Sequence, residues 1–546
     1  MSAELAQRLK KAFDDYAAGQ LDVVYSECRS LIRADKRLSG AHYLLGLVLI
    51  EKDEPRKAIE SLKQALAVGA DNPALRMALG RAYRMGGAIA MAITEYENAV
   101  RLAPGYGEAL HALGTAHLDA GNMSDALLVL GELAELDPEN PGVLSALGVA
   151  LRQAGRAEAA ARIFEKATVL APDRASLWSN AGVALMESGE PEKALPYLQK
   201  AVELEPAAVQ YRRNLALGLT AAGRGSEAAD ILDGLLDEQP EDPQLVLDLA
   251  AAMVKAGEDP VELLQEAVEV IDDDTRLWYA LGEALRAAGK FDDAIDAYDR
   301  CLELDPDDKH GATLALALSG ADPAPPAPPE AYVAQLFDDY AGRFDTELTK
   351  YLDYKGPALL AKLAQTVAPD RKFDSAYDIG CGTGLAAPFF RPLAHRLIGV
   401  DLSPKMVEQA RARGQYDALA VDEAVAWMQA QGPRGADLIF AADVLVYLGD
   451  LGPFLAAAMR SLRPGGLLLF TTEATQDPAV PYELHQGHRY AHGGDALRAS
   501  LQAASFQKIT VDAASTRTNR GQPVPGWIVS AWTAAPIAPS FKERRV

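Results

Sequence analysis

The residues best suited to chemistry form a glycine-rich turn, Asp378-Ile-Gly-Cys-Gly-Thr-Gly384, which is followed by Asp401. The turn comes directly after an apolar run at residues 375–379. Glycines in such a turn let the backbone approach a ligand closely at the carboxyl edge of a sheet. Asp401 ends the next apolar run, where a carboxylate can accept hydrogen bonds from both hydroxyls of a ribose. Together these features predict a site for a nucleoside-containing ligand.

The spacing of the glycines distinguishes this turn from a dinucleotide-binding turn. A dinucleotide fingerprint would place a third glycine at position 385, which is Leu385 here. A pyrophosphate is also poorly matched to a carboxylate beside it, whereas Asp378, two positions before the first glycine, can meet a cationic amino group. S-adenosylmethionine carries both a ribose and such an amino group. The residues therefore indicate a site for this methyl donor.

A second group of reactive side chains comprises His485, His488 and His492, with Tyr490 among them. The spacing i, i+3, i+7 can place three histidines on one helical face, where they can bind a metal. Gly487 interrupts such a helix and no acidic or cysteine ligand completes the set, so we expect no metal. The segment is then either a lid over the acceptor pocket or a plain surface loop. His488, Tyr490 and His492 are the candidate bases for taking a proton from an acceptor.

The elements that must position these residues alternate between strand and helix from residue 375 onward. Strand-like apolar runs occur at residues 375–379, 396–400, 418–421, 437–441 and 466–472. Helical patterns follow them near residues 385–394, 404–413, 423–430, 451–462 and 494–504. This alternation predicts a parallel, doubly wound sheet. Two last runs, 506–515 and 527–533, are joined only by a loop and predict an antiparallel pair at the end of the sheet.

Over residues 373–534 the sequence resembles a class I S-adenosylmethionine-dependent methyltransferase with a Rossmann-like α/β fold. The motifs that carry the resemblance are D-I-G-C-G-T-G at 378–384, G-V-D-L-S-P-x-M at 399–406, D-L-I-F-A-A-D-V-L-x-Y-L at 437–448 and L-R-P-G-G-L-L-L-F at 462–470. The resemblance implies that S-adenosylmethionine is the cofactor. The cofactor-binding residues that it implies are Asp378, Gly380, Gly382, Gly384, Asp401, Leu402, Asp422, Ala441, Asp443 and Tyr340.

The resemblance implies one role for some of these residues and leaves two interpretations open for others. Asp378 is expected to hold the methionine end, and Leu402 and Ala441 to sandwich the adenine ring. Asp422 faces the adenine amino group or serves instead as a helix N-cap, because an apolar-periodic stretch begins directly after it. Asp443 lies near the transferred methyl group or has a packing or capping role, and the same holds for Tyr447. Tyr340 belongs to a helix that folds over the cofactor.

The first 320 residues repeat with a fixed period. Small residues recur at 34-residue spacing at Gly46, Gly80, Gly114, Gly148, Gly182, Ala216 and Ala250, and Gly282 follows after 32 residues. Each repeat breaks at a second glycine and most end at a proline, so each contains two short helices. This pattern resembles the tetratricopeptide repeat and implies an all-α superhelix with a concave groove. We expect eight clear repeats and one degenerate repeat, at residues 5–38.

The groove of such an array is the expected binding surface. Positions of the first helices that face it include six arginines in an otherwise acidic array: Arg81, Arg84, Arg152, Arg213, Arg276 and Arg286. They either hold an extended peptide or acidic segment through bidentate contacts or simply solvate a helix face. The first interpretation predicts a protein or peptide partner.

Composition bounds the remaining possibilities. The net charge of −24 disfavours general nucleic-acid binding, and residues 331–546 hold 22 Lys+Arg and 22 Asp+Glu, so the excess negative charge lies before them. No apolar run approaches the length of a membrane span, and the three cysteines fit neither a disulfide framework nor a zinc site. These properties favour a cytoplasmic protein that does not bind membranes.

The predicted organisation is a repeat array at residues 1–320, a proline-rich linker at 321–330 and a methyltransferase domain at 331–546. The linker has no apolar periodicity and is expected to act as a semi-rigid spacer. As a whole the chain resembles bacterial methyltransferases fused to tetratricopeptide repeats, which implies an enzyme whose array recruits a protein or peptide substrate. The alternatives are a small-molecule methyltransferase whose array serves assembly, and a non-catalytic scaffold that binds S-adenosylmethionine. The methyl acceptor, whether O, N or C, and the oligomeric state do not follow from the sequence.

Overall fold

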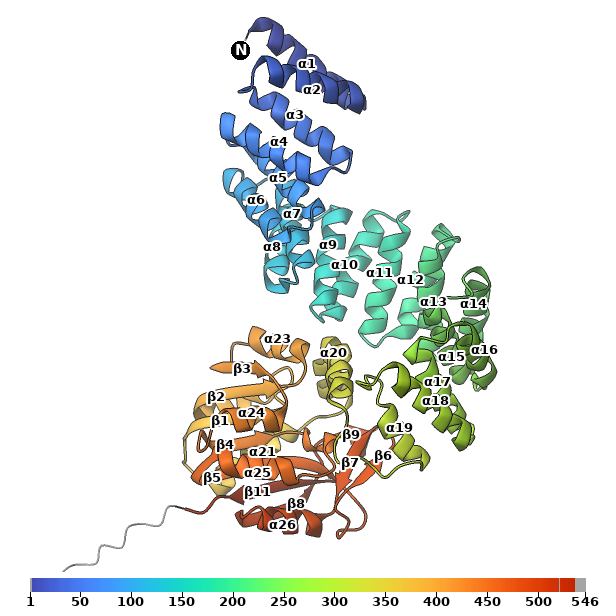
Figure 1. The fold of residues 1–546 in the computed structure, drawn as a ribbon, viewed down its shortest axis with the longest axis vertical. Helices are drawn as coiled ribbons and strands as arrows, with labels where there is room; N and C mark the ends of the chain where they lie inside the picture. Colours follow the sequence, from blue (N-terminus) through green and yellow to red (C-terminus); the bar gives the residue numbers. More distant parts are fainter. Residues whose placement is uncertain (1, 520, 536–546) are drawn as a thin grey trace, which may run out of the picture. The chain divides into compact units, whose positions relative to one another are not determined.

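The computed structural model of the chain describes residues 2–519 and 521–535. The chain divides into two compact units, Met1–Ile231 and Leu232–Val546. The first unit is entirely helical, and the second contains further helices followed by an α/β domain (Figure 1). Among the described residues, no helix is both long and apolar enough to cross a membrane.

Consecutive antiparallel helices build the first unit. They are α1 Ala3–Ala17, α2 Leu21–Ala34, α3 Ser39–Glu51, α4 Pro55–Val68, α5 Pro73–Met85, α6 Ile89–Leu102, α7 Gly107–Asp119, α8 Met123–Leu136, α9 Pro141–Gln153, α10 Ala157–Leu170, α11 Ala175–Glu187, α12 Pro191–Leu204 and α13 Val209–Ala221. Helix α14 (Gly225–Glu238) crosses the boundary between the units. The degenerate first repeat, α1 with α2, forms a helical hairpin like the others.

The 34-residue period arises from close packing inside each hairpin. A Cβ atom added at Gly148 in α9 would lie 2.6 Å from the ring of Phe164 in α10. Added Cβ atoms at the equivalent positions would lie 2.4 to 2.5 Å from the facing side chain: Gly46, Gly80, Gly114, Gly182 and Gly282. A glycine with a positive φ, for example 70° at Gly155, ends the first helix of every repeat except that of α3, where Asp53 has a φ of 57°. These features confirm the prediction of helical repeats.

The second unit begins with the last repeats. Its helices are α15 Pro243–Ala256, α16 Val261–Val270, α17 Thr275–Ala287, α18 Phe291–Leu304 and α19 Ala312–Ser319. Helix α16 is shorter than the other second helices, and this is the repeat in which the sequence lacks two residues. Helix α19 packs on α18 and ends the array.

Five of the six groove arginines form described ion pairs with acidic residues of the array. Arg84 bonds Asp119 at 2.6 Å, and Arg152 bonds Glu187 at 3.0 Å, each pair joining neighbouring repeats. The other described ion pairs of the groove arginines are Arg81–Glu51, Arg276–Asp274 and Arg286–Glu283. Arg213 also interacts within the chain. The arginines with described ion pairs therefore neutralise carboxylates of the array itself, and the six do not form a bare cationic surface.

The α/β domain is built on a nine-stranded sheet with the order β3-β2-β1-β4-β5-β11-β8, to which β7 and β6 add beyond β5. Its strands are β1 Phe373–Ile379, β2 Ala394–Asp401, β3 Ala418–Val421, β4 Ala436–Ala441, β5 Leu462–Ala474, β6 Glu483–His485, β7 Arg489–His492, β8 Gln507–Ala514 and β11 Gly526–Trp532. Strands β1 to β5 are parallel, and β11 pairs antiparallel with both β5 and β8. This confirms the predicted doubly wound sheet with its antiparallel end.

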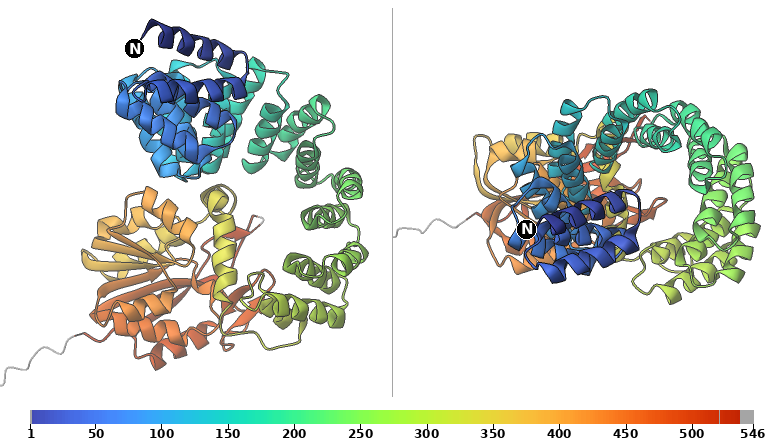
Figure 2. Two further views of the ribbon diagram at one scale, coloured as in Figure 1. Left: turned by 45° about the horizontal axis from the view of Figure 1, so that its top comes forward. Right: turned by 90° about the horizontal axis from the view of Figure 1, so that it is seen from above.

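Helices cover both faces of the sheet (Figures 1 and 2). Side chains of α21 (Gly356–Val367) and α22 (Ala387–Phe390) form one apolar layer with the sheet. Side chains of α24 (Ala424–Ala430), α25 (Gly452–Ser461) and α26 (Gly494–Ala503) form the other. Helix α23 (Pro404–Ala412) follows β2, and α20 (Glu330–Thr346) with the π-helical turn Glu347–Tyr351 precedes α21. Two layers of helices thus leave the carboxyl ends of the strands as the place for a site.

Two short pairings were not predicted from the sequence. Strands β6 and β7 form a hairpin in the histidine-containing insert, and β7 pairs parallel with the end of β5. Strands β9 (Thr518–Asn519) and β10 (Gln522–Pro523) form a separate two-stranded sheet. The insert is therefore an ordered extension of the main sheet.

Substitution of the close-packed glycine tests the origin of the repeat period. We expect Gly148→Ala to destabilise the first unit by about 1–3 kcal/mol, because the added methyl group overlaps the Phe164 ring. Gly131 in α8 is the matched control, since nothing lies within 4 Å of its added Cβ atom. Gly131→Ala should stabilise the helix by about 0.5–1 kcal/mol. Thermal unfolding followed by circular dichroism measures both, and equal effects would contradict the packing explanation.

Candidate functional site

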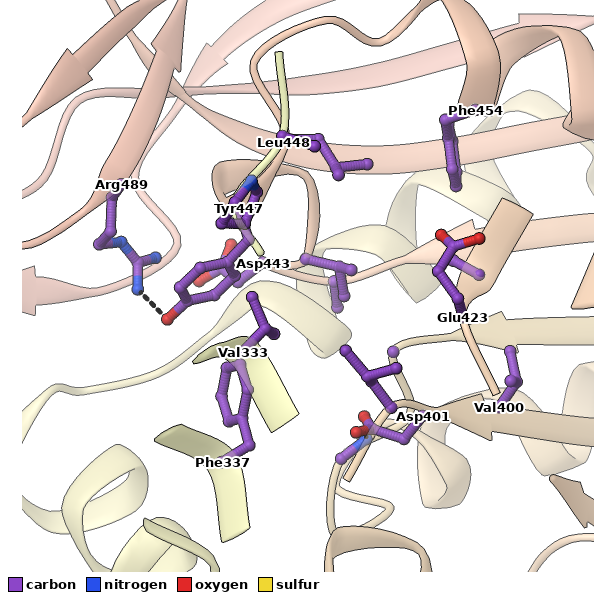
Figure 3. Close-up of a pocket in the computed structure, with 18 of the residues that line it drawn as sticks. Val333, Phe337, Val400, Asp401, Glu423, Asp443, Tyr447, Leu448, Phe454 and Arg489 are labelled. Carbon is purple, nitrogen blue, oxygen red and sulfur yellow. Dashed lines mark hydrogen bonds between the residues drawn. The ribbon is translucent and has the colours of Figure 1, made fainter. Parts of the chain in front are cut away.

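A cavity of about 460 Å³ lies within the second unit, between the carboxyl ends of the parallel strands and helix α20. Its lining comes from the turns after β1, β2, β3 and β4, from α20 and from the segment before α20. Arg489 at the start of β7 and Arg517 in the loop after β8 complete the wall. Figure 3 shows polar side chains at two separate ends, with apolar side chains such as Phe337 between them.

Asp401 anchors the glycine turn to the end of β2. Its two carboxylate oxygens accept hydrogen bonds from the backbone N–H groups of Gly382, at 2.7 Å, and Ser403, at 2.9 Å. Gly380 and Gly382 line the cavity with positive φ, and an added Cβ atom at Gly380 would lie 2.4 Å from Val444. Burial raises the pKa of Asp401 above its ordinary value. Each oxygen keeps a second lone pair for a ligand hydroxyl.

The turn after β3 places Asp422 at the cavity, beside Leu402 and Val425. Helix α24 is capped by Glu423, whose carboxylate accepts hydrogen bonds from the N–H groups of Val425, at 2.9 Å, and Ala426, at 2.7 Å. The alternative interpretation of Asp422 as the N-cap is therefore wrong. The Asp422 carboxylate accepts a hydrogen bond from the N–H of Glu423 and remains exposed.

Ala441, Gly384 and Asp378 lie behind the described cavity lining. Ala441 is fully buried in β4, and its neighbour Ala442 lines the cavity instead. Asp378 is 1% exposed, and its carboxylate accepts a hydrogen bond from the hydroxyl of Tyr416 at 2.6 Å. Burial raises the pKa of Asp378 to about 8. The described partner of the Asp378 side chain is thus Tyr416, and Asp378 itself does not belong to the described cavity lining.

Helix α20 covers the cavity and is fastened at two places. The carboxylate of Asp338 accepts hydrogen bonds from the hydroxyl of Ser403, at 2.5 Å, and the N–H of Lys405, at 3.2 Å. About two helical turns further on, Asp345 accepts a hydrogen bond from the hydroxyl of Thr383 at 2.5 Å and pairs with Arg413. These contacts join α20 to the glycine turn and to the segment after β2.

Aromatic side chains of α20 face the cavity. Phe337, Tyr340 and Phe344 line it, and the hydroxyl of Tyr340 donates to Glu347 at 2.6 Å. Phe337 packs against Tyr447 with ring centroids 5.2 Å apart. The predicted position of Tyr340 on a helix over the site thus agrees with the structure, and the helix makes the cavity apolar on one side.

The proline-rich segment before α20 is also part of the cavity wall. Residues 326–328 line the cavity, and the carbonyl of Pro326 accepts hydrogen bonds from the N–H groups of Gly449 and Asp450, each at 2.9 Å. The carbonyl of Pro325 accepts one from the hydroxyl of Tyr490 at 2.8 Å. These residues of the predicted semi-rigid spacer are therefore held against the domain by hydrogen bonds.

The three predicted bases have partners outside the cavity. Tyr490 is fully buried against Pro325, and the ring nitrogens of His492 contact the Thr472 hydroxyl at 2.7 Å and the Gly449 carbonyl at 3.1 Å. His488 contacts the hydroxyl of Tyr332 in α20 at 2.9 Å. None of the three belongs to the described cavity lining, so this geometry does not favour a role as base. Within the described residues, no group of His, Cys, Asp and Glu could hold a metal ion.

The second polar end of the cavity contains Asp443, Tyr447, Arg489 and Arg517. Arg489 donates to the hydroxyl of Tyr447 at 2.9 Å, as Figure 3 shows. Asp443 has a positive φ of 57°, and burial raises its pKa. Sequence reasoning missed both arginines. Arg489 lies within the insert that had been noticed for its histidines, and no motif marks Arg517.

The fold and this site define a Rossmann-like domain of the class I methyltransferase type behind helical repeats. Comparison with known families agrees: residues 377–470 match the family described as "Methyltransferase domain". Residues 275–308 match "Tetratricopeptide repeat", and a second family of the same description matches residues 43–107, 111–175 and 180–243. The chain therefore combines tetratricopeptide repeats with a methyltransferase domain.

Curated relatives share only part of the chain. The "Ubiquinone biosynthesis O-methyltransferase" of Rhodopseudomonas palustris (strain BisB18) is 33% identical over 96 residues, which cover 17% of this chain and 38% of that protein. The "Malonyl-[acyl-carrier protein] O-methyltransferase" of Hahella chejuensis is 36% identical over 139 residues, which cover 24% and 48%. The chain thus spans less than half of the length of these two relatives.

Among solved structures, a tetratricopeptide repeat protein from Parabacteroides merdae is similar to part of the chain. The match covers 46% of this chain and all of that one, with 15% sequence identity and a TM-score of 0.37.

The raised pKa of Asp378 makes a pH-dependent prediction. The folded protein keeps a proton that the unfolded carboxyl group releases near its usual pKa of 3.8, so the free energy of unfolding falls as pH rises from there to about 8. We expect Asp378→Asn to remove this decline, by up to about 1.4 kcal/mol per pH unit, since the amide is neutral throughout. Chemical unfolding of both proteins at pH 5 and pH 8 measures it. Parallel pH dependence in the two would contradict the buried, protonated carboxyl group.

Proposed function

We propose that the protein is an S-adenosylmethionine-dependent methyltransferase whose cavity under α20 binds the methyl donor and the acceptor. The observation that carries the proposal is the joint placement of Asp401 and the glycine turn at one end of the cavity. A glycine-rich turn lets the protein backbone approach a ligand closely, and a carboxylate with free lone pairs can accept hydrogen bonds from two ribose hydroxyls. The residues present therefore fit the nucleoside part of S-adenosylmethionine.

We propose the following roles for the residues of this end. Asp401 accepts the ribose hydroxyls, and Asp422 accepts a hydrogen bond from the adenine amino group. Leu402 packs on one side of the adenine ring. Ala442 lies on the other side, with Ala441 of β4 behind it. Asp378 holds the methionine end through the amino group or a water molecule. The remaining cofactor residues of this proposal are Gly380, Gly382, Gly384, Asp443 and Tyr340.

Methyl transfer needs alignment and exclusion of water more than acid–base chemistry, because the sulfonium is a good leaving group. Helix α20 and its aromatic side chains provide the cover. His488, Tyr490 and His492 hold the wall and the segments around it, so we propose that they position these elements. The acceptor enters the other polar end, beside Asp443 and Tyr447.

The cofactor assignment predicts a loss of affinity in Asp401→Ala. We expect S-adenosylmethionine and S-adenosylhomocysteine to bind at least about ten-fold more weakly, because two charge-assisted hydrogen bonds are lost. Asp374→Ala is the matched control: this carboxylate pairs with Arg463 at the opposite end of β1 and should leave affinity unchanged. Calorimetric titration of full-length proteins measures both. Unchanged affinity in a folded Asp401→Ala protein would contradict the assignment.

We further propose that the repeat array recruits a protein or peptide that presents the acceptor. Stacked helical hairpins of this family type offer a long surface that a small metabolite does not use. The six groove arginines interact with groups of the chain itself, so recruitment would require exchange of these interactions. They are Arg81, Arg84, Arg152, Arg213, Arg276 and Arg286. The printed names of the relatives favour a second candidate, an O-methyltransferase of a small or carrier-bound molecule.

Deletion of the first compact unit distinguishes the two candidates. The experiment compares the full-length protein with residues 232–546, which retain the last repeats beside the methyltransferase domain. Each protein is incubated with methyl-labelled S-adenosylmethionine and lysate of the source organism. Recruitment predicts label in macromolecules that falls at least about five-fold on deletion, with S-adenosylhomocysteine affinity unchanged. Label only in small molecules, at equal rates for both proteins, would favour the second candidate and contradict recruitment.

A further inference from the structure

Two guanidinium groups lie at the acceptor end of the cavity. Arg489 begins β7, and Arg517 lies in the loop between β8 and β9, so the fold brings them together from separate segments. Figure 3 shows Arg489 with Tyr447 on the side of the cavity away from Asp401 and Glu423. The side chains of Arg489 and Arg517 are 22% and 14% exposed, and both line the cavity.

One carboxylate oxygen serves both arginines. Nε of Arg489 and Nη2 of Arg517 each donate to Oε1 of Glu473 at 2.7 Å. An arginine stays charged under all conditions in a protein, so Glu473 balances only one of the two positive charges. The two arginines lower the pKa of Glu473, which keeps it ionised. Further guanidinium N–H groups remain available for a ligand.

Asp443 is an acidic group at this end, and Glu330 and Asp450 also belong to the cavity lining. The hydroxyls of Thr471 and Thr516 donate to its two oxygens, at 2.7 and 2.9 Å. If Asp443 is ionised, the two arginines and two acids sum to zero, and the sulfonium of the methyl donor then adds one positive charge. If Asp443 is protonated, the excess is two. In both states the two guanidinium groups at this end favour an acceptor that brings a negative charge.

We propose that the acceptor is a carboxylate, bound by Arg489 and Arg517, and that the product is its methyl ester. This inference rests on the proposed methyltransferase function. In the reaction one carboxylate oxygen forms a bond to the methyl carbon, the bond from that carbon to sulfur breaks, and its electron pair goes to the sulfur. The opposite charges of acceptor and sulfonium cancel, and no proton moves.

The described cavity lining lacks the nitrogen and thiol bases that often remove a proton from an acceptor, which agrees with this acceptor. An ordinary carboxyl group has a pKa near 4 and is already ionised at neutral pH. A phenol, alcohol or ammonium group must lose a proton, yet the described cavity lining contains no histidine, lysine or cysteine. His492, whose pKa burial lowers to about 4, and His488 are both held outside it. A carboxylate acceptor makes such a base unnecessary.

Matched pairs of acids and amides test the binding step without turnover. Full-length protein saturated with S-adenosylhomocysteine is titrated with hexanoate, hexanamide, benzoate and benzamide by calorimetry. We expect each acid to bind at least about ten-fold more tightly than its amide, because only the acid accepts charge-assisted bonds from both arginines. Arg517→Gln and Arg489→Gln should each remove most of this preference while S-adenosylhomocysteine affinity stays within about three-fold.

The substitution Glu473→Gln should raise the affinity for acids, whereas the arginine substitutions lower it. It releases both guanidinium groups from their internal partner, so acid binding should strengthen by at least about three-fold in a protein with an unchanged circular dichroism spectrum. A loss of function through misfolding cannot produce such a gain. Equal binding of acid and amide, no binding of either, or a preference that survives both arginine substitutions would overturn the carboxylate assignment.

The chemistry of the product separates this inference from the proposed function. Methyl-labelled product made in lysate is treated with alkali, which hydrolyses methyl esters and releases volatile methanol. We expect most of the label to become volatile. Label that survives alkali would overturn the carboxylate acceptor but leave the methyltransferase proposal intact, whereas failure of S-adenosylhomocysteine to bind at all would contradict the proposed function itself.

Discussion

The hydrogen bonds that Asp401 accepts from Gly382 and Ser403 hold the site together. They tie the glycine turn after β1 to the start of α23, so the turn and the Asp401 carboxylate are held together. Ser403 then donates its hydroxyl to Asp338 of α20, which extends these contacts to the cover of the cavity. The same few residues therefore shape the proposed cofactor pocket and close it, and the raised pKa of Asp401 reflects both its burial and the neighbouring Asp338 carboxylate.

Helix α20 connects this site to the last repeats. Tyr332 packs on Gly311, where an added Cβ atom would lie 2.9 Å from its ring, and its hydroxyl reaches His488 in the β6–β7 hairpin. Arg286 of α17 also contacts Gln486 of this hairpin at 3.0 Å. These contacts explain why the last repeats and the α/β domain form one compact unit, although the sequence places a proline-rich segment between them.

Much of this architecture follows from local sequence rules. The repeat period comes from glycines that each meet a large side chain within the same hairpin, and the strands begin within a few residues of their predicted positions because apolar runs and turn glycines are local signals. The glycine turn, Asp401 and Asp422 come together because parallel strands end at one edge of the sheet. Such placement depends on topology alone, so the sequence predicts it well.

Long-range partners explain what the sequence did not predict. Strand β7 pairs with β5 across an insert, which places Tyr490 and His492 inside the wall and Arg489 at the cavity. The acidic partners of Arg84 and Arg152 lie in the next repeat, 35 residues away in both cases, and this shared spacing was a usable signal. No sequence signal marks Arg517, because its position depends on how the loop after β8 returns to Glu473.

Hydrogen exchange of the full-length protein, with and without S-adenosylhomocysteine, tests the central claim most directly. If the ligand binds between the glycine turn and α20, amides of residues 380–384, 401–403 and 330–346 should exchange more slowly in its presence, since local opening of the cover is suppressed. The first repeats should exchange unchanged. Protection confined to other parts of the chain, or no protection at saturating ligand, would contradict a cofactor site beneath α20.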